Sequence, residues 1–322
     1  MPHNGCPHQC SFCNQKNITG ISSQPSAQEI EDTLKKAVAD LGDSAQYYEI
    51  AFFGGSFTAI NRQYMIALLD AAKPFLPRFK GIRISTRPDY IDKNILSLLK
   101  SYGVTSIELG AQSMDNSVLE LNERGHTEDD VINASRLIRN SGFSLGLQMM
   151  TGLYGATPET DIYTARRFIE LRPDTVRVYP TVIMKNTALA QLYERGVYKP
   201  YSLDTSVDLC AKLILMFENA SIQLIRLGLH YSDSLEQNSL GGNYHPAFKE
   251  LCENKIFYDS FIEKTQGFSD KKVNVIINPK SISKFLGQKK SNIIKLQQSG
   301  YDIHISFDST KSKYGLEVMQ CV

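Results

Sequence analysis

Segments with the pattern of β-strands alternate with segments that have helical periodicity up to about residue 180. In the first helical segment, Ile30, Leu34, Ala37 and Leu41 recur every three or four positions. Such alternation is typical of a parallel sheet whose strands are joined by helices. Strands are expected at residues 47–53, 82–85, 106–109, 145–150 and 175–179. Helices are expected at residues 26–41, 63–75, 92–102, 129–141 and 160–171.

Three cysteines stand close together near the amino terminus, with Cys6, Cys10 and Cys13 in a C-x3-C-x2-C pattern. A [4Fe–4S] cluster is normally held by four thiolates, so three leave one iron open to another ligand. An open coordination position is typical of catalytic metal sites. The aromatic ring of Phe12 is expected to shield such a cluster from water, which tunes its reduction potential.

Two other interpretations of the triplet are a zinc site that uses His3 or His8 as its fourth ligand, and a chance grouping of cysteines. The spacing, with an aromatic residue before the third cysteine, resembles the radical S-adenosylmethionine (SAM) superfamily. The resemblance implies that the open iron binds the amino and carboxylate groups of SAM. It also implies reductive cleavage of SAM to a 5′-deoxyadenosyl radical that abstracts hydrogen from substrate, with flavodoxin or ferredoxin as the reductant.

Only five residues precede Cys6, whereas in this superfamily a strand leads directly into the cysteine loop. The expected fold is therefore α/β, a partial (β/α)6 TIM-like radical SAM barrel lacking most of its first strand. An exposed sheet edge beside the cysteine loop and lower stability than that of a complete barrel are expected. Ligand-binding residues are expected at the carboxyl ends of the strands, where the loops of such barrels carry the active site.

Two strand ends carry residues suited to binding SAM. Gly54 and Gly55 end the first predicted strand, where glycine lets the backbone approach a ligand closely. Their position resembles the glycine-rich motif that holds the methionine moiety of SAM, with Ser56 in place of an acidic residue. After the next strand, Arg87 is a candidate partner for the SAM carboxylate. Asp89 is expected to cap the following helix rather than to act in catalysis.

Further polar residues fall on or near the ends of predicted strands. Ser85 and Gln112 are candidate hydrogen-bonding partners of SAM, Gln112 for its ribose or carboxylate. Gln148 and Tyr179 are candidate contacts of the adenine ring. His126 is expected to start a helix rather than to act as a base.

Several segments resemble, in the same order, the radical SAM half of the Elongator catalytic subunit, a family that acts on the wobble uridine of tRNA. The segments are GGSFT, TRPDY, ELGAQS, ERGHT and RVYPT, followed by Gly196-Val-Tyr198 and Tyr201-Ser202. The resemblance covers residues 1–229. This chain differs from that family in its cysteine spacing, because the first gap is longer in Elongator. It also lacks an acetyltransferase-like segment after the barrel, so acetyl-CoA chemistry is not carried over.

Composition restricts where the chain acts. No run of eighteen apolar residues exists, so no membrane span is expected. The amino terminus lacks the apolar region of a secretion signal, and Cys210, Cys252 and Cys321 are scattered, which fits a reduced cytoplasmic protein. The net charge is only +1, yet residues 271–299 contain seven lysines and no acidic residue.

The last part of the chain has its own pattern. Residues 230–269 are expected to form a helical connector after the barrel domain of residues 1–229, and residues 270–322 a small α+β domain. Its order of strand, helix, Gly287-containing loop, helix and strand resembles a KH domain, whose loop clamps a nucleic-acid backbone. Lysines are the candidate phosphate contacts, namely Lys284, Lys289, Lys290 and Lys295. The other interpretation is a solvated lysine-rich surface on a small packing domain.

Together these features predict a radical SAM enzyme that modifies RNA, with tRNA as the first candidate. A second interpretation keeps the radical chemistry with a small-molecule substrate, because LGAQS and TGL also resemble oxygen-independent coproporphyrinogen oxidases. A third is a non-catalytic RNA-binding protein with a structural metal site.

Overall fold

The computed structural model describes residues 6, 9–14, 24–230 and 233–321. These residues divide into two compact units. The first unit contains residues up to 202 and residues 216–244, and the second contains residues 203–215 and 245–322. His3 and His8, the alternative zinc ligands, lie outside the described residues.

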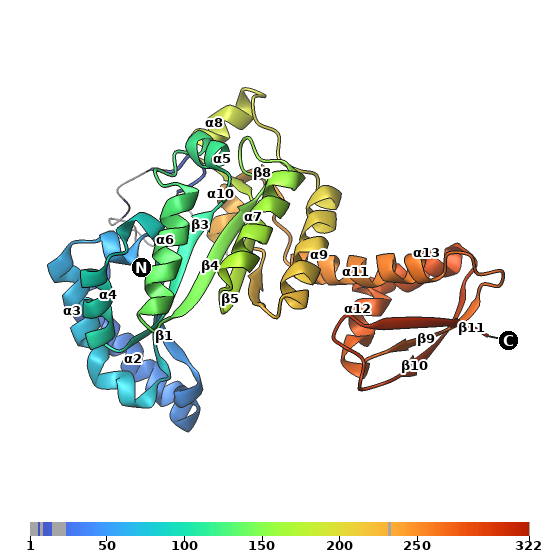
Figure 1. Cartoon of the computed structure of the whole chain (residues 1–322), viewed down its shortest axis with the longest axis horizontal. Coiled ribbons are helices and arrows are strands. Elements are labelled where there is room, and N and C mark those ends of the chain that lie inside the picture. Colours follow the sequence, from blue (N-terminus) through green and yellow to red (C-terminus); the bar gives the residue numbers. More distant parts are fainter. Residues whose placement is uncertain (1–5, 7–8, 15–23, 231–232, 322) are drawn as a thin grey trace. The chain divides into compact units, whose positions relative to one another are not determined.

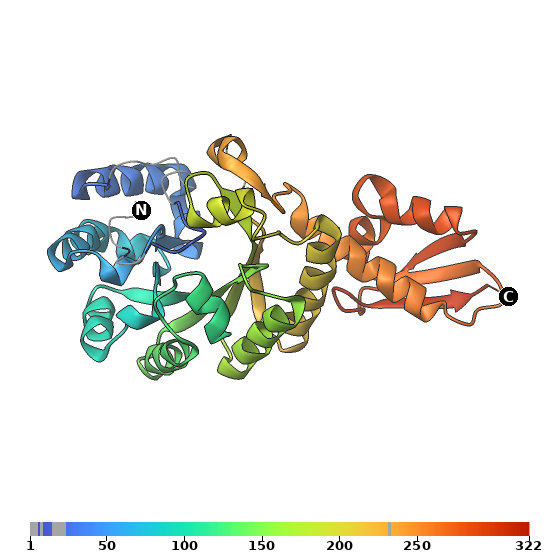
Figure 2. The same ribbon diagram turned by 90° about the horizontal axis from the view of Figure 1, so that it is seen from above.

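The first unit is built on a parallel six-stranded sheet in the order β1-β2-β3-β4-β5-β7 (Figures 1 and 2). Its strands are β1 (Glu49–Phe52), β2 (Gly81–Thr86), β3 (Val104–Gln112), β4 (Ser144–Thr151), β5 (Thr175–Pro180) and β7 (Gln223–Leu227). The sheet curls into a half-barrel, which confirms the predicted partial (β/α)6 architecture. In the part of the chain that the structure describes, β1 pairs only with β2 and is therefore an edge of the sheet, as expected.

The two faces of this sheet differ in polarity because side chains alternate along each strand. One face carries fully buried apolar side chains such as Ile84, Leu109, Leu147 and Val178. Helices α4 (Lys93–Ser101), α6 (Glu128–Asn140) and α7 (Pro158–Leu171) pack on β3 and β4. The opposite, concave face carries polar and charged residues, which leaves it available for ligands.

Helices α2 (Ala27–Leu41) and α3 (Arg62–Ala72) follow the predicted positions closely. Three further helices of this unit were not predicted, namely α5 (Asn116–Leu121), α8 (Ala188–Glu194) and α10 (Asp233–Asn238). The side chains of Ser26 and Thr127 cap α2 and α6 by accepting backbone N–H bonds. The prediction that Asp89 caps α4 is wrong: Asp92 accepts the N–H of Ile95, and Asp89 lies in a 3₁₀ turn.

Three strands of the first unit are also absent from the sequence-based prediction. Strand β7 forms an edge of the sheet, although its pattern of partly exposed residues gave no strand signal. Strands β6 (Val182–Met184) and β8 (Ser239–Gly242) form a small antiparallel pair, and β8 lies within the region expected to be a helical connector.

The second unit is a three-stranded sheet with helices on one face. Strand β9 (Lys272–Ile277) lies between β10 (Asp302–Phe307), which is parallel to it, and β11 (Leu316–Gln320), which is antiparallel. The helices are α11 (Phe248–Lys264), α12 (Ile282–Leu286) and α13 (Ser291–Gln298), and α9 (Leu203–Asn219) contributes its first residues. Phe257 and Phe261 of α11 join Val275 and Phe285 in the core of this unit.

The predicted order of strand, helix, loop, helix and strand is present in residues 272–307, whereas β11 was not predicted. The KH-like identity of this unit and the three predicted domain boundaries stay predictions. Among the described helices, none combines the length and the apolar character that a membrane span requires.

Candidate active site

The cysteine loop is tied to two distant segments by backbone hydrogen bonds. The N–H of Ser11 donates to the carbonyl of Asn122 at 3.2 Å, and the N–H of Leu189 donates to the carbonyl of Ser11 at 2.7 Å. The Ser11 hydroxyl also donates to Asn122 Oδ1 at 2.9 Å. Within the loop, the N–H of Cys13 donates to the carbonyl of Cys10 at 3.0 Å. These bonds hold the loop in place without using its cysteine side chains.

Apolar residues surround this loop. Cys10 and Phe12 are buried together with Leu153, Ile183 and Tyr198 in one hydrophobic cluster. The Phe12 ring therefore lies beside the cysteines and away from solvent, where sequence reasoning placed it. A dry, apolar surrounding of this kind strengthens electrostatic interactions with any group that the cysteines bind.

The glycine-rich loop after β1 lies beside Cys6. Gly54 and Gly55 have φ angles of 103° and 80°, which other residues rarely adopt. The backbone of Ser56 lies near the Cys6 thiol and acts to lower its pKa. Although Cys6 as a residue is exposed, burial of its thiol, followed by the neighbouring Cys10, raises the pKa of Cys6. The two predicted motifs are thus brought together.

The Ser56 side chain connects this loop to the end of β2. Its hydroxyl lies 2.8 Å from the Thr86 hydroxyl and accepts the Arg87 N–H at 3.2 Å. Ser56 is fully buried, so this bond fixes the backbone on both sides of the site. Ser56, which stands where the resembling motif has an acidic residue, thus makes a structural contact with its side chain.

Arg87 is buried and forms a bidentate ion pair with Asp89. Its Nε and Nη2 atoms donate to the two carboxylate oxygens of Asp89, both at 2.9 Å. The remaining Nη1 atom is buried and has no partner among the described residues. Buried donors are almost always satisfied, so this nitrogen is suited to a ligand or a water molecule.

The end of β3 has a strained backbone. The register between β3 and β4 shifts at Gly110 and Gln112, and Gln112 has a φ of 70°. Its side-chain Oε1 is buried without a partner among the described residues. Strain and unsatisfied polar atoms occur together at ligand sites, where bound groups complete the hydrogen bonding.

His126 lies on the loop that follows α5. Its Nε2 atom is 3.1 Å from the carbonyl of Ala111, and Nδ1 is buried without a described partner. Burial, followed by the positive charges of Arg124 and Arg87, lowers the pKa of His126 to about 3. The ring is therefore neutral at physiological pH, so Nε2 carries the proton toward Ala111 and Nδ1 is an acceptor.

Arg124 makes a contact that sequence reasoning missed. Its Nη1 atom donates to the sulfur of Cys10 at 3.0 Å, and its Nη2 atom donates to the carbonyl of Gly110 at 2.6 Å. Arg124 stands 114 positions from Cys10 in the chain, and nothing in its own segment indicates that contact. The motif that contains it, ERGHT, was the only available signal.

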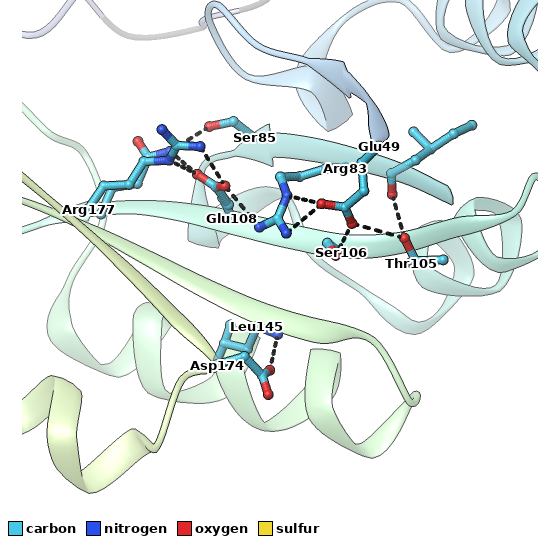
Figure 3. Close-up of polar contacts among 11 residues, drawn as sticks. Glu49, Arg83, Ser85, Thr105, Ser106, Glu108, Leu145, Asp174 and Arg177 are labelled. Atoms are coloured by element: carbon cyan, nitrogen blue, oxygen red, sulfur yellow. Dashed lines mark hydrogen bonds and ion pairs between the residues drawn. The ribbon is translucent and has the colours of Figure 1, made fainter. Parts of the chain in front are cut away.

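The concave face of the sheet carries an ion-pair network centred on Glu108 (Figure 3). Arg177 Nε and Arg83 Nη1 donate to the Glu108 carboxylate at 2.7 and 3.1 Å. Gln148 donates to Glu108 at 2.8 Å and to the Ser85 hydroxyl at 3.3 Å. Ser85 and Gln148, both predicted SAM contacts, are thus partners of this network.

Tyr179 continues the polar face along β5. Burial raises the pKa of its phenol, while Arg177 opposes this effect. Arg226, whose strand position pairs with that of Arg177, has its pKa lowered by burial and by the charge of Arg177. Positive charge therefore gathers at this end of the concave face.

A buried carboxyl group that the sequence did not indicate lies at the end of β4. Asp161 accepts the N–H of Gly152 at 2.9 Å and the hydroxyl of Tyr201 at 3.2 Å. Burial raises the pKa of Asp161 to about 7. The Tyr198 hydroxyl donates to the carbonyl of the same glycine at 2.6 Å. These bonds tie the segment after α8 to the end of the strand.

The predicted site residues thus form two groups in the first unit. The cysteine loop, the glycine loop, Arg87 and Gln112 lie together at the strand ends, whereas Ser85 and Gln148 lie deeper on the concave face. In the described part of the chain, no three His, Cys, Asp or Glu side chains are arranged to hold a single metal ion.

The predicted RNA-binding residues lie in the second unit. Lys289 and Lys290 are exposed and have φ angles of 53° and 62°, and Gly287 has a φ of 82°. A Cβ atom on Gly287 would lie 2.8 Å from the backbone nitrogen of Asn292, so the loop requires glycine there. The loop therefore presents two adjacent ammonium groups to solvent.

The other two lysines have internal contacts. Lys284 forms a salt bridge with Glu253 at 3.2 Å and lies over the Tyr314 ring. Lys295 is exposed, with its ammonium 5.9 Å from the centre of the Tyr258 ring.

Comparison with known proteins identifies the family. Residues 1–168 match the radical SAM superfamily, and residues 173–257 match the radical SAM C-terminal domain. The chain is 30% identical over 243 residues to the tRNA uridine(34) acetyltransferase of Dehalococcoides mccartyi (strain CBDB1), covering 65% of this chain and 53% of that protein. It is 39% identical over 207 residues to Elongator complex protein 3 of Dictyostelium discoideum, covering 58% of this chain and 36% of that protein.

Solved structures share the fold. The archaeal Elp3 of Methanocaldococcus infernus with an amino-terminal deletion has a TM-score of 0.62 at 22% identity, covering 74% of this chain and 59% of that one. Coproporphyrinogen III oxidase from Escherichia coli has a TM-score of 0.50 at 23% identity, covering 68% of this chain and 52% of that one. The chain spans about half or less of the curated relatives it matches. From the match over residues 1–168 and the half-barrel that carries the cysteine loop, we conclude that the chain belongs to the radical SAM superfamily and resembles the radical SAM half of its Elongator branch.

Proposed function

We propose that this protein is a radical SAM enzyme that modifies RNA, with tRNA as the first candidate substrate. The observation that supports the chemistry best is the position of the cysteine loop. It is fastened between Asn122 and Leu189, next to strand ends that carry unsatisfied buried polar atoms. A parallel α/β barrel places its ligands at this end of the strands.

The residues present fit a [4Fe–4S] cluster with SAM. Three neighbouring thiols, of which Cys10 is buried in the apolar cluster, suit an iron–sulfur cluster with Cys6, Cys10 and Cys13 as its ligands. The buried Nη1 of Arg87 and Oε1 of Gln112 are a donor and an acceptor without partners, as a ligand with both amino and carboxylate groups requires. When bound, the cluster and SAM supply one-electron cleavage of the sulfonium and hence hydrogen abstraction.

The chain's own residues bind and orient these groups and exclude water. Gly54 and Gly55 provide a backbone without side chains beside Cys6, which lets a ligand approach closely. The hydrophobic cluster that contains Phe12 excludes water from the cysteine loop. His126, neutral and buried, offers an acceptor nitrogen on the same side of the sheet.

Two observations support an RNA substrate. Two of the relatives are named as tRNA uridine(34) acetyltransferase and Elongator complex protein 3, and they match 65% and 58% of this chain. The Gly287 loop of the second unit presents Lys289 and Lys290 to solvent in a conformation suited to contact a phosphate backbone.

The chemistry is tested by reconstituting the protein anaerobically with iron and sulfide, reducing it in the presence of SAM and measuring 5′-deoxyadenosine. The wild type is expected to produce it, and Cys10→Ala is expected to reduce the yield at least a hundredfold because the cluster loses a ligand. Cys321→Ala is the matched control, since this half-buried cysteine lies in the second unit. Full activity of Cys10→Ala would refute the site, and an inactive wild type with a loaded cluster would favour a binding protein.

The substrate is tested by measuring tRNA binding at several salt concentrations. Reversing both charges in Lys289→Glu with Lys290→Glu is expected to weaken binding and to lower the salt dependence by about one to two units of slope. Lys271→Glu with Lys272→Glu makes the same charge change at the opposite end of the second unit's sheet, at the start of β9. Equal effects of the two double variants would reject a role for the loop. A wild type that cleaves SAM but does not bind RNA would favour a small-molecule substrate.

A further inference from the structure

A buried guanidinium from a distant segment of the chain, that of Arg124, contacts the cysteine loop. Arg124 stands just after α5, and its Nη1 atom donates to the sulfur of Cys10 at 3.0 Å. Only 6% of Arg124 and 7% of Cys10 are exposed, so solvent screens this contact little. Hydrogen bonds to a thiolate sulfur from an arginine are charge-assisted and hence stronger than neutral ones.

Among the described residues, no salt bridge joins the charge of Arg124 to an Asp or Glu, whereas Arg83, Arg87 and Arg177 each have at least one. A buried cation is expensive unless an anion or several acceptors compensate it. The described polar partners are one carbonyl, that of Gly110, and the Cys10 sulfur. The compensating negative charge must therefore come from the cysteine site.

The orientation of this guanidinium is fixed on several sides. The carbonyl of Gly110 accepts from Nη2 at 2.6 Å, at the strained end of β3. The Phe12 ring lies 5.9 Å from the guanidinium carbon, which is a cation–π distance. The charge of Arg124 also acts on the Cys6 sulfur. One cation thus faces two of the three cysteines.

We infer that Arg124 is the counter-ion of the cysteine site, a positioning residue that raises the reduction potential of the cluster held there. The inference rests on the proposed function, because it requires that the cysteines bind an iron–sulfur cluster. Reduction adds one negative charge to the cluster, and a fixed cation and an N–H bond to a ligating sulfur stabilise the reduced form more than the oxidised one. Charge and hydrogen bonds to sulfur are among the factors that set such potentials.

The experiment is a potentiometric titration of the reconstituted protein with dithionite, followed by EPR spectroscopy and carried out without SAM. Arg124→Gln removes the charge, Arg124→Lys keeps it, and Arg139→Gln is the control. Arg139 donates at 2.8 Å to the carbonyls of Leu171 and Arg172 and lies on α6 away from the cysteines. Bound iron and sulfide and the melting temperature are measured for each protein.

In Arg124→Gln, the ratio of reduced to oxidised cluster at a fixed potential is expected to fall about tenfold. This corresponds to a shift of about 59 mV for a one-electron couple. Arg124→Lys is expected to recover most of the shift, and Arg139→Gln to match the wild type. Cluster loss in Arg124→Gln alone, with the melting temperature kept, would also support the inference because Arg124→Lys retains the charge.

The inference would be overturned if the Arg124→Gln protein bound a full cluster and that cluster had the wild-type reduction potential. Equal loss of the cluster in Arg124→Gln and Arg124→Lys would do the same, because it would mean that the shape of arginine matters and its charge does not. A wild type that takes up no cluster would instead refute the proposed function, so the two failures can be told apart.

Discussion

Two buried polar regions of the same sheet differ in whether their hydrogen bonds are complete. Around Glu108, on the middle of the concave face, both carboxylate oxygens have arginine partners, and Gln148 adds a third donor. At the strand ends, Arg87 Nη1, Gln112 Oε1 and His126 Nδ1 are buried without described partners. The first region stabilises the sheet by itself, whereas the second has the unsatisfied atoms of a site that a ligand completes.

The packing around Glu108 supports this contrast. A Cβ atom on Gly146 would lie 2.6 Å from Glu108 Cγ, so the glycine of β4 makes room for the carboxylate. Arg177 also lies over the Phe53 ring at 5.1 Å. Gln112 differs in its backbone, which adopts a strained φ of 70°.

The largest expected effect on stability comes from the ion-pair network around Glu108, whose hydrogen bonds are complete. Glu108→Gln should lower the free energy of unfolding by about 3 kcal/mol, because two arginines lose their buried counter-charge. Chemical denaturation measures this, with Glu31→Gln as the control: its salt bridge to Lys35 is exposed and should contribute less than about 0.5 kcal/mol. A loss below about 1 kcal/mol for Glu108→Gln would mean that the network is not a stabilising unit.

The pH dependence of stability separates two groups at the strand ends. The pKa of His126 falls from 6.5 to about 3 on folding, so its contribution is complete above pH 6.5 and is lost as the pH falls toward 3. The pKa of Asp161 rises from 3.8 to about 7, so its contribution is complete below pH 3.8 and is lost as the pH rises toward 7. Between these limits the two effects oppose each other.

Replacing either residue should therefore reveal the pH dependence of stability that the other contributes. In Asp161→Asn, the free energy of unfolding should fall by about 1 kcal/mol per pH unit as the pH drops from 6.5 to 4. In His126→Gln, it should rise over the same interval by a similar amount. Urea denaturation at several pH values measures both slopes. Parallel curves for the two variants and the wild type would contradict the assigned pKa shifts.

The smallest expected effect on stability is at Gln112. Gln112→Gly relieves the positive φ and removes an oxygen that has no partner, so stability should stay the same or rise by up to about 1 kcal/mol. SAM affinity should fall about tenfold, because one hydrogen bond to the ligand is lost.

A matched control for this variant is Ser221→Gly. Ser221 has a φ of 56° in the turn between α9 and β7. The control should give a similar change in stability with unchanged SAM affinity, measured by equilibrium dialysis on the reconstituted protein. A marked loss of stability in Gln112→Gly would place Gln112 with the structural network.

Much of the fold could be predicted from periodicity. The strands β1 to β5 and their helices have strong patterns because one side of each element faces a continuous apolar core. Strand β7 has partly exposed residues from Leu224 to Arg226 at the edge of the sheet, so its alternation is weak. The α4 cap was assigned wrongly because Asp89 forms a local ion pair with Arg87, two residues before it, while Asp92 accepts the N–H of Ile95.

The site was predictable where a local motif carries the chemistry, and not where distant residues meet. The cysteine and glycine motifs are local, and the structure places them side by side at Cys6 and Ser56. Arg124 gains its importance only through folding, since its contact with Cys10 joins segments 114 residues apart. The unsatisfied oxygen of Gln112 likewise depends on a register shift that no single strand sequence encodes.

The way in which the cysteine loop is fastened has a consequence for the order of assembly during synthesis. Ser11 is synthesised well before its backbone partners Asn122 and Leu189. At about 5–20 residues per second, the ribosome needs on the order of ten seconds or more to reach the second of them. The thiols therefore leave the ribosome long before their scaffold exists. Under the proposed function, a cluster inserted into this completed scaffold would be loaded only after nearly the whole barrel is made, as a late step in maturation.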